Sequence, residues 1–166
     1  MVALEPYSEH NREYGYDQAN SRRAETEKEV QEWLGEQMDL RSKGRYHAHR
    51  GTEVSQRNRT DIIVSSTAAK VEVVIEIKHG GKSWSGRALK AALEKQLTGK
   101  YLNPRERRHG ILLITHHGEK GWQHPDTRKR LGFGGLIEYL RKVADSTTEN
   151  QYGPVQVRVF GLDASG

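Results

Sequence analysis

The sequence predicts an α/β domain in which helices flank a mixed central sheet. Two runs rich in Val and Ile, at 61–66 and 71–78, are separated by four small or polar residues, a pattern typical of a β-hairpin. A third apolar run at 109–115 is bounded by turn residues, as expected for a strand covered on both faces. Stretches with helical spacing of apolar residues lie before, between and after these runs, which favours helices packed against a sheet.

The composition indicates one polar domain with an appendage. The chain has 166 residues, of which 34% are hydrophobic and 30% charged, enough for one core. Residues 1–20 are polar without a clear period, so we expect an N-terminal arm or linker there and a domain over 21–166. The chain contains no cysteine, which excludes a disulfide framework and a thiolate zinc site. Because no membrane-span or signal-peptide pattern is present either, we expect a cytoplasmic protein without a membrane partner.

The charge balance indicates a polyphosphate partner. The net charge is +5, and Arg57 and Arg59 belong to a cluster just before the first apolar run. In the glycine-rich loop after the second run, Lys82 is placed to contact a phosphate and Trp84 to stack on a base. A solvated rim is the alternative for the basic cluster, and cover for the edge of the core is the alternative for Trp84.

The first helix is predicted over 21–41. Ser21 suits the N-cap position, and acidic residues crowd the first turns, where they complement the helix dipole. Val30 and Leu34 belong to an apolar stripe at helical spacing, and Glu27 extends this stripe towards the N-terminus. A carboxylate on a buried stripe requires a reason, so Glu27 is a candidate site residue.

The strands that follow have a testable register. Residues 45–54 alternate weakly and predict a first strand, which leads into the hairpin. Pairing Ser66 with Val71 makes one face of the hairpin wholly apolar, whereas a slip of one residue would scatter the apolar side chains over both faces. In this register the cross-strand pairs are Ile62 with Ile75, Ile63 with Val74, Val64 with Val73, Ser65 with Glu72, and Asp61 with Glu76.

Two carboxylates therefore converge at the open end of the hairpin. Asp61 and Glu76 would have Cβ atoms about 4.5–5.5 Å apart, a destabilising like-charge pair unless a cation compensates. Lys78 lies on the same face of the strand as Glu76, because side chains alternate with a period of two. The backbone carbonyl of Ile77 points sideways between these groups.

Asp61 followed by Glu76-Ile77-Lys78 resembles the active-site hairpin of the PD-(D/E)XK nuclease superfamily, with Thr60 in place of the motif's Pro. The resemblance implies that Asp61, Glu76 and the Ile77 carbonyl bind Mg²⁺, or Mn²⁺ as a substitute, and that Lys78 helps to place or activate the attacking water. It also implies that Glu27 is the acidic residue of the first helix that reaches the site. The alternative to a catalytic role is that Glu76 and Lys78 lie on a solvated strand face, because Glu-x-Lys is frequent on such faces.

A second helix is predicted over 87–102, with Leu residues at four-residue spacing. In the RecB-like branch of the superfamily a Gln and a Tyr on this helix orient the site, and Gln96 matches the Gln. The match is imperfect because Tyr101 follows after five residues rather than four, which places the two on different faces of a regular helix. Either Gln96 alone keeps the role or the helix is irregular near Gly99; a core position is the simpler reading of Tyr101.

A third helix over 126–145 and a last strand over 155–160 complete the predicted order of elements. This order resembles the restriction-endonuclease-like αβββαβ core with an added helix and strand, over residues 21–162. The resemblance implies a Mg²⁺-dependent deoxyribonuclease, an endonuclease by expectation, that serves as a homodimer or as the effector attached to a sensor domain in antiviral defence, repair or restriction. The alternative is a catalytically silent module of the same fold that binds nucleic acid or another protein.

Overall fold

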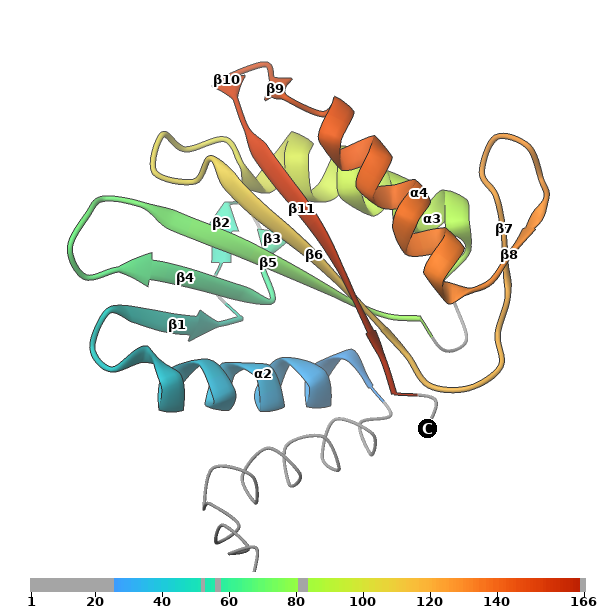
Figure 1. Ribbon diagram of the computed structural model, residues 1–166. Coiled ribbons are helices and arrows are strands. Elements are labelled where there is room, and N and C mark those ends of the chain that lie inside the picture. The colour runs from blue at the N-terminus through green and yellow to red at the C-terminus, as the bar shows by residue number, and fades with distance from the viewer. Residues whose placement is uncertain (1–25, 52, 56–57, 81–83, 165–166) are drawn as a thin grey trace, which may run out of the picture.

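The computed structural model describes residues 26–164, apart from 52, 56–57 and 81–83, and has a five-stranded mixed sheet between helices (Figure 1). The predicted arm at 1–20 and the predicted cap Ser21 lie outside the described residues. The strand order is β1-β4-β5-β6-β11; the first three strands pair antiparallel, and β6 pairs parallel with both β5 and β11. The elements are α2 (Glu27–Ser42), β1 (Tyr46–Arg50), β2 (Glu53–Ser55), β3 (Asn58–Arg59), β4 (Ile62–Ser66), β5 (Glu72–His79), α3 (Gly86–Ala91), the π-helix η1 (Ala92–Tyr101), β6 (His109–His116), β7 (Trp122–Gln123), β8 (Arg130–Leu131), α4 (Phe133–Ser146), β9 (Glu149–Asn150), β10 (Gly153–Pro154) and β11 (Gln156–Asp163).

The β4–β5 hairpin has the predicted register. Ile62 pairs with Ile75 and Val64 with Val73, and the Ser66 N–H donates to the Val71 carbonyl at 3.0 Å. The Ser66 hydroxyl also accepts the N–H groups of two turn residues, as hydroxyls in tight turns commonly do. The apolar pattern was therefore sufficient to fix which side chains face each side of the sheet.

The predicted first strand over 45–54 is wrong in its second half. β1 ends at Arg50, and Gly51 has a positive φ of 60°, a backbone conformation that residues other than glycine rarely adopt. The Gly51 N–H donates to the Asp61 carbonyl at 2.9 Å, one position beyond the last β1–β4 pair, Arg50 with Ile62. The next residues form the separate two-stranded ribbon β2–β3.

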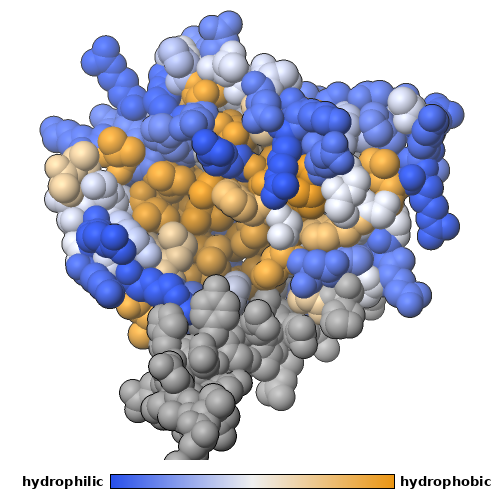
Figure 2. All heavy atoms as spheres, in the orientation of Figure 1, coloured by the Kyte–Doolittle hydropathy of each residue, from blue (hydrophilic) through white to orange (hydrophobic). Residues whose placement is uncertain are grey.

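Helix α2 packs on one face of the sheet. Its N-cap is Thr26, whose hydroxyl accepts the Glu29 N–H while the Glu29 carboxylate accepts the Thr26 N–H, a capping box. Val30 is buried against the apolar face of the hairpin, with Leu34 partly buried beside it. This helix covers part of the face only, and Figure 2 shows hydrophobic side chains gathered at the centre of that view between hydrophilic ones.

The other face carries the larger core, which α3, η1 and α4 cover. The predicted second helix is present over 86–101, but its last ten residues form a π-helix. The predicted third helix begins later than expected: residues 122–131 form the β7–β8 ribbon and its turn, and α4 starts at Phe133. The predicted strands at 109–115 and 155–160 are confirmed as β6 and β11. In the described part of the chain, no helix has the length and apolar character needed to cross a membrane.

Candidate active site

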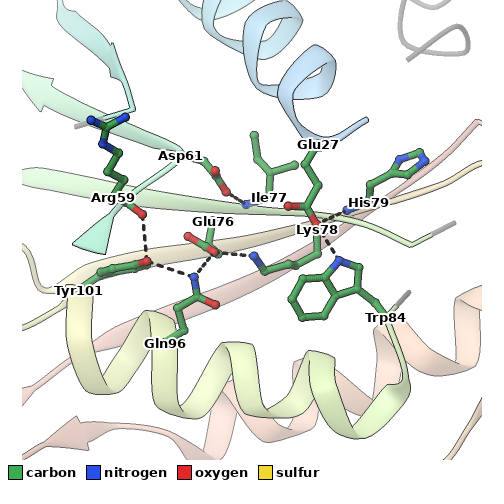
Figure 3. Close-up of polar contacts among 10 residues, drawn as sticks. All are labelled: Glu27, Arg59, Asp61, Glu76, Ile77, Lys78, His79, Trp84, Gln96 and Tyr101. Atoms are coloured by element: carbon green, nitrogen blue, oxygen red, sulfur yellow. Dashed lines mark hydrogen bonds and ion pairs between the residues drawn. The ribbon is translucent and has the colours of Figure 1, made fainter. Parts of the chain in front are cut away.

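The strand half of the candidate site lies where β4 ends and β5 continues. The β4–β5 ladder stops at the Ile62–Ile75 pair, so Asp61 is just outside the strand, and its Oδ2 accepts the Ile77 N–H at 2.7 Å. Because the N–H and C=O of one residue point to the same edge of an extended strand, the Ile77 carbonyl also points to this edge. Figure 3 shows Glu76 and Lys78 side by side on the face that α3 and η1 cover.

Glu76 and Lys78 form a buried ion pair. Lys78 Nζ lies 2.7 Å from Glu76 Oε1, and the two residues are only 5% and 2% exposed, respectively. Removing two charges from water is costly, so such a pair is weak evidence of stability and calls for a reason.

The electrostatics of this half reflect burial and crowding of carboxylates. Burial, and then repulsion from Asp61, raise the pKa of Glu76 to about 7, although Lys78 opposes the shift. Burial also raises the pKa of Asp61, against the Ile77 N–H and Lys78, which lower it. For Lys78, burial is the largest single influence and would lower the pKa, but the nearby carboxylates, Glu76 foremost, together raise it. The positive charge of Lys78 therefore does not offset the burial and mutual repulsion of the two carboxylates.

One oxygen of the Glu76 carboxylate is suited to binding a cation. Among the described residues no donor reaches the buried Glu76 Oε2, whereas Oε1 accepts from both Lys78 and Gln96. No group of three or more His, Cys, Asp or Glu side chains in the described part of the chain is arranged to hold a metal alone. The predicted set differs because it combines two carboxylates, Asp61 and Glu76, with the Ile77 carbonyl, an all-oxygen set suited to Mg²⁺ or Mn²⁺.

The helix half of the site consists of Gln96 and Tyr101 on η1. Gln96 Nε2 lies 2.5 Å from Glu76 Oε1 and 3.1 Å from the Tyr101 hydroxyl, which in turn donates to the Arg59 carbonyl at 2.9 Å. Of the two alternatives left by the sequence, the structure has the irregular helix: the i→i+5 pattern of a π-helix brings residues five apart onto one face. Tyr101 is only 4% exposed, so it is a core residue as well.

Glu27, at the first position of α2, reaches the end of β5 from the opposite side. Its Oε1 accepts the Trp84 indole N–H at 2.7 Å and the His79 N–H at 3.3 Å. The Trp84 ring is partly buried against the larger core and lies over Lys78, with Nζ 4.6 Å from the ring centroid. Trp84 therefore links Glu27 to Lys78, a role that the sequence did not indicate.

Three further residues were predicted to contact nucleic acid. Arg59 has an exposed side chain and contributes its carbonyl to Tyr101. Arg57 and Lys82, predicted to contact nucleic acid, lie outside the described residues. The structure thus brings together Glu27, Asp61, Glu76, Ile77, Lys78, Trp84 and Gln96, and adds Tyr101 to them (Figure 3).

Comparisons with known proteins add little to this geometry. No protein-family model matches the chain, and no curated protein matches it. Among solved structures, the chain is similar to a protein of unknown function from Silicibacter pomeroyi, with 15% identity over 65% of this chain and 77% of that one. The TM-score of that match is 0.32, too low to bear on fold or function.

Proposed function

We propose that this protein is a divalent-cation-dependent nuclease that hydrolyses phosphodiester bonds in DNA. The observation that carries the proposal is the buried Oε2 of Glu76, which no donor reaches among the described residues, beside a second carboxylate, Asp61. A bound cation would satisfy that oxygen and offset the repulsion between the two carboxylates.

Each residue has a distinct part in the proposed chemistry. Asp61, Glu76 and the Ile77 carbonyl would hold Mg²⁺ or Mn²⁺, which supplies charge neutralisation at the phosphate and an activated water. Lys78 places an ammonium group beside Glu76, where it would orient the attacking water or stabilise negative charge on the phosphate oxygens. Gln96 and Tyr101 hold the Glu76 carboxylate in place.

The arrangement of elements supports a restriction-endonuclease-like core. Helix α2 precedes three antiparallel strands, β1, β4 and β5, and a helix then crosses to β6, which is parallel to β5. The net charge of +5 favours association with a polyanion.

A binding module without catalysis is the second candidate. The observation that favours it is the Glu76–Lys78 ion pair, since each charge already has a partner and both are almost completely buried. In that case the pair is structural, and divalent cations should have no effect on the protein.

Cleavage of supercoiled plasmid and linear DNA in Mg²⁺, Mn²⁺ or EDTA tests the proposal, with the intact protein compared with Glu76→Ala and Lys78→Ala. The matched control is Glu72→Ala, which removes a carboxylate from the same strand and face, about 13 Å away at about 3.3 Å per residue. We expect metal-dependent nicking or linearisation that both site variants lose and the control keeps.

Thermal denaturation of the same proteins separates the two candidates. A cation that binds only the folded state raises its apparent stability. Stabilisation by Mn²⁺ that Glu76→Ala abolishes, without any cleavage, would indicate a metal site that lacks its substrate or partner. No cleavage and no stabilisation by either metal would contradict the nuclease and leave the binding module.

A further inference from the structure

The alignment of Gln96 with Tyr101 depends on an unusual stretch of backbone. In a regular α-helix, residues five apart are about 140° apart around the axis and would not meet. Over 92–101 the chain instead forms a π-helix of ten residues, a geometry that is rare and mostly limited to single turns. Such a run requires support from the surrounding structure.

Part of the support comes from the helix itself and the strand beneath it. The Thr98 hydroxyl donates to the Leu93 carbonyl at 2.9 Å, and the Leu102 N–H donates to the Leu97 carbonyl at 3.2 Å, both across five residues. Gly110 on β6 permits close packing, since a Cβ there would lie 3.0 Å from a Leu102 methyl and 3.1 Å from Leu97. These contacts stabilise the middle of η1 but leave the carbonyls near its end to be satisfied.

A side chain from a distant hairpin donates to two of those carbonyls. Asn150, at the end of β9, donates from Nδ2 to the Thr98 carbonyl and to the Leu102 carbonyl, both at 3.0 Å. Its Oδ1 accepts from Arg108 at 3.1 Å and from the Tyr152 N–H at 2.9 Å. Arg108 also donates to the Leu102 carbonyl at 3.1 Å. The amide of Asn150 thus matches two acceptors on one side and two donors on the other, which only one orientation allows.

We propose that Asn150 is a positioning residue for the candidate active site, which holds the end of η1 in the π-helical form that lets Gln96 and Tyr101 meet at Glu76. The expected effect of Asn150 on the cleavage rate rests on the proposed nuclease function. Its effect on the position of Gln96 does not, because it follows from the fold alone. Orientation of groups that hold metal ligands commonly decides metal affinity and activity.

The side-chain amide of Gln96 reports the proposed role directly. Its ¹⁵N–¹H signals, assigned by their loss in Gln96→Ala, are compared between the full chain and Asn150→Asp, which keeps the size but turns acceptors towards the two carbonyls. Gln151→Glu is the matched control, because it makes the same chemical change at an exposed position of the same turn. We expect the Gln96 signals to shift and broaden in Asn150→Asp and to stay in place in the control.

Asn150→Ala provides a second variant, since it removes the donor without adding a charge. It should move the Gln96 signals in the same direction by a smaller amount, and it carries the test if Asn150→Asp does not fold. Unchanged Gln96 signals in a folded Asn150 variant would overturn the proposal.

A double-mutant cycle connects this role with cleavage. We expect Asn150→Asp to lower the cleavage rate roughly tenfold, given that misplacing a group by about 1 Å can cost about a hundredfold. If Asn150 acts through Gln96, Asn150→Asp should have no further effect in a Gln96→Ala background. Additive effects would overturn the proposal. If the unaltered protein does not cleave DNA at all, the nuclease function fails and the signals of Gln96 alone decide the role of Asn150.

Discussion

The two halves of the candidate site are built on different principles. The strand half, Asp61, Glu76 and Lys78, follows from a regular hairpin whose register the apolar residues fix. The helix half, Gln96 and Tyr101, follows from an irregular helix whose end is held by a side chain from another part of the chain. In the proposed mechanism the first half supplies the metal ligands and the lysine, and the second half orients Glu76, so changes in the first should have larger effects.

The largest effect is expected from Asp61→Asn. The asparagine keeps the shape and can still accept the Ile77 N–H, but it removes one charge from the proposed metal site. Loss of a cation that supplies several kcal/mol of transition-state stabilisation predicts a cleavage rate lower by roughly a thousandfold, or about 4 kcal/mol. Plasmid cleavage at saturating Mg²⁺ measures the change, with the exposed Asp145→Asn as control.

Although Asp61→Asn should lower the cleavage rate, it should not lower the stability of the protein in the absence of metal. In EDTA, Asp61→Asn should unfold at the same temperature as the intact protein or higher, because it removes repulsion with Glu76. A marked loss of stability in EDTA would mean that the Asp61 charge has a structural role instead.

The pH dependence of stability should show the cost of burying the carboxylates of the strand half close together. Glu76 has a pKa of about 7 in the folded protein and an ordinary value of 4.5, so between these values the folded state binds more protons than the unfolded state. The free energy of unfolding in EDTA should therefore fall as the pH rises from about 4.5 to 7, by up to about 3 kcal/mol. Asp61, whose pKa is also raised, contributes in the same direction.

Urea denaturation at a series of pH values measures this slope. Glu76→Gln should flatten it, since the variant has no carboxyl group to titrate there. An unchanged slope in Glu76→Gln would show that other groups cause the pH dependence. Saturating Mn²⁺ should also reduce the slope if the cation binds the ionised form of Glu76.

The strand half could be predicted from the sequence because a strand leaves little freedom. A period of two and one favourable register determined which side chains pair, and the structure confirms the pairs from Ile62–Ile75 to Ser65–Glu72. The predicted pair of Asp61 with Glu76 is not part of the ladder, because Asp61 lies just outside β4 and its carboxylate accepts the Ile77 N–H. Another exception is Gly51, where a positive φ ended the first strand early; alternation alone gives no sign of such a turn. The late start of α4 has a similar origin, since residues 122–131 pair as a ribbon in a stretch with no clear period.

The sequence indicated Gln96, but it could not decide whether Gln96 and Tyr101 share a face, since that geometry depends on distant residues. The five-residue spacing from Gln96 to Tyr101 argued against a shared face under the ordinary assumption of 3.6 residues per turn. The π-helix that reconciles them is completed by Asn150, 52 residues after Thr98, and no local pattern signals this contact. The contact between Glu27 and Trp84 spans 57 residues and was missed for the same reason.

A smaller effect is expected from Tyr101→Phe, which tests the helix half alone. The variant keeps the buried ring but loses the hydroxyl that accepts from Gln96 and donates to Arg59. Removal of a group that orients a metal ligand typically costs about 10–100-fold in metal affinity or activity, and we expect the lower end because Gln96 still donates to Glu76. Cleavage at varied Mg²⁺ measures the change.

The result for Tyr101→Phe shows how the helix half acts on the proposed metal site. A rise in the Mg²⁺ concentration needed for half-maximal cleavage would show that the helix half acts by orienting Glu76. A loss as large as that of Asp61→Asn would erase the distinction between the halves. The exposed Tyr152→Phe is the matched control.

The smallest effect is expected from Trp84→Phe, which separates the two contacts of Trp84. Phenylalanine keeps an aromatic ring beside Lys78 but lacks the indole N–H that donates to Glu27 at 2.7 Å. Because the His79 N–H still donates to the same Glu27 oxygen, we expect a loss of about threefold in cleavage rate, about 0.7 kcal/mol.

Trp84→Leu should cost more than Trp84→Phe because it also removes the ring beside Lys78. A cation over an aromatic face gains about 0.5–2 kcal/mol, more when the pair is desolvated as it is beside the buried Lys78. Equal losses in the two variants would assign the whole effect to the contact with Glu27, and Glu27→Ala, which removes the acceptor, should then reproduce it. A loss confined to Trp84→Leu would instead assign the effect to the ring over Lys78, so this pair of variants decides whether Trp84 acts through Glu27 or through Lys78.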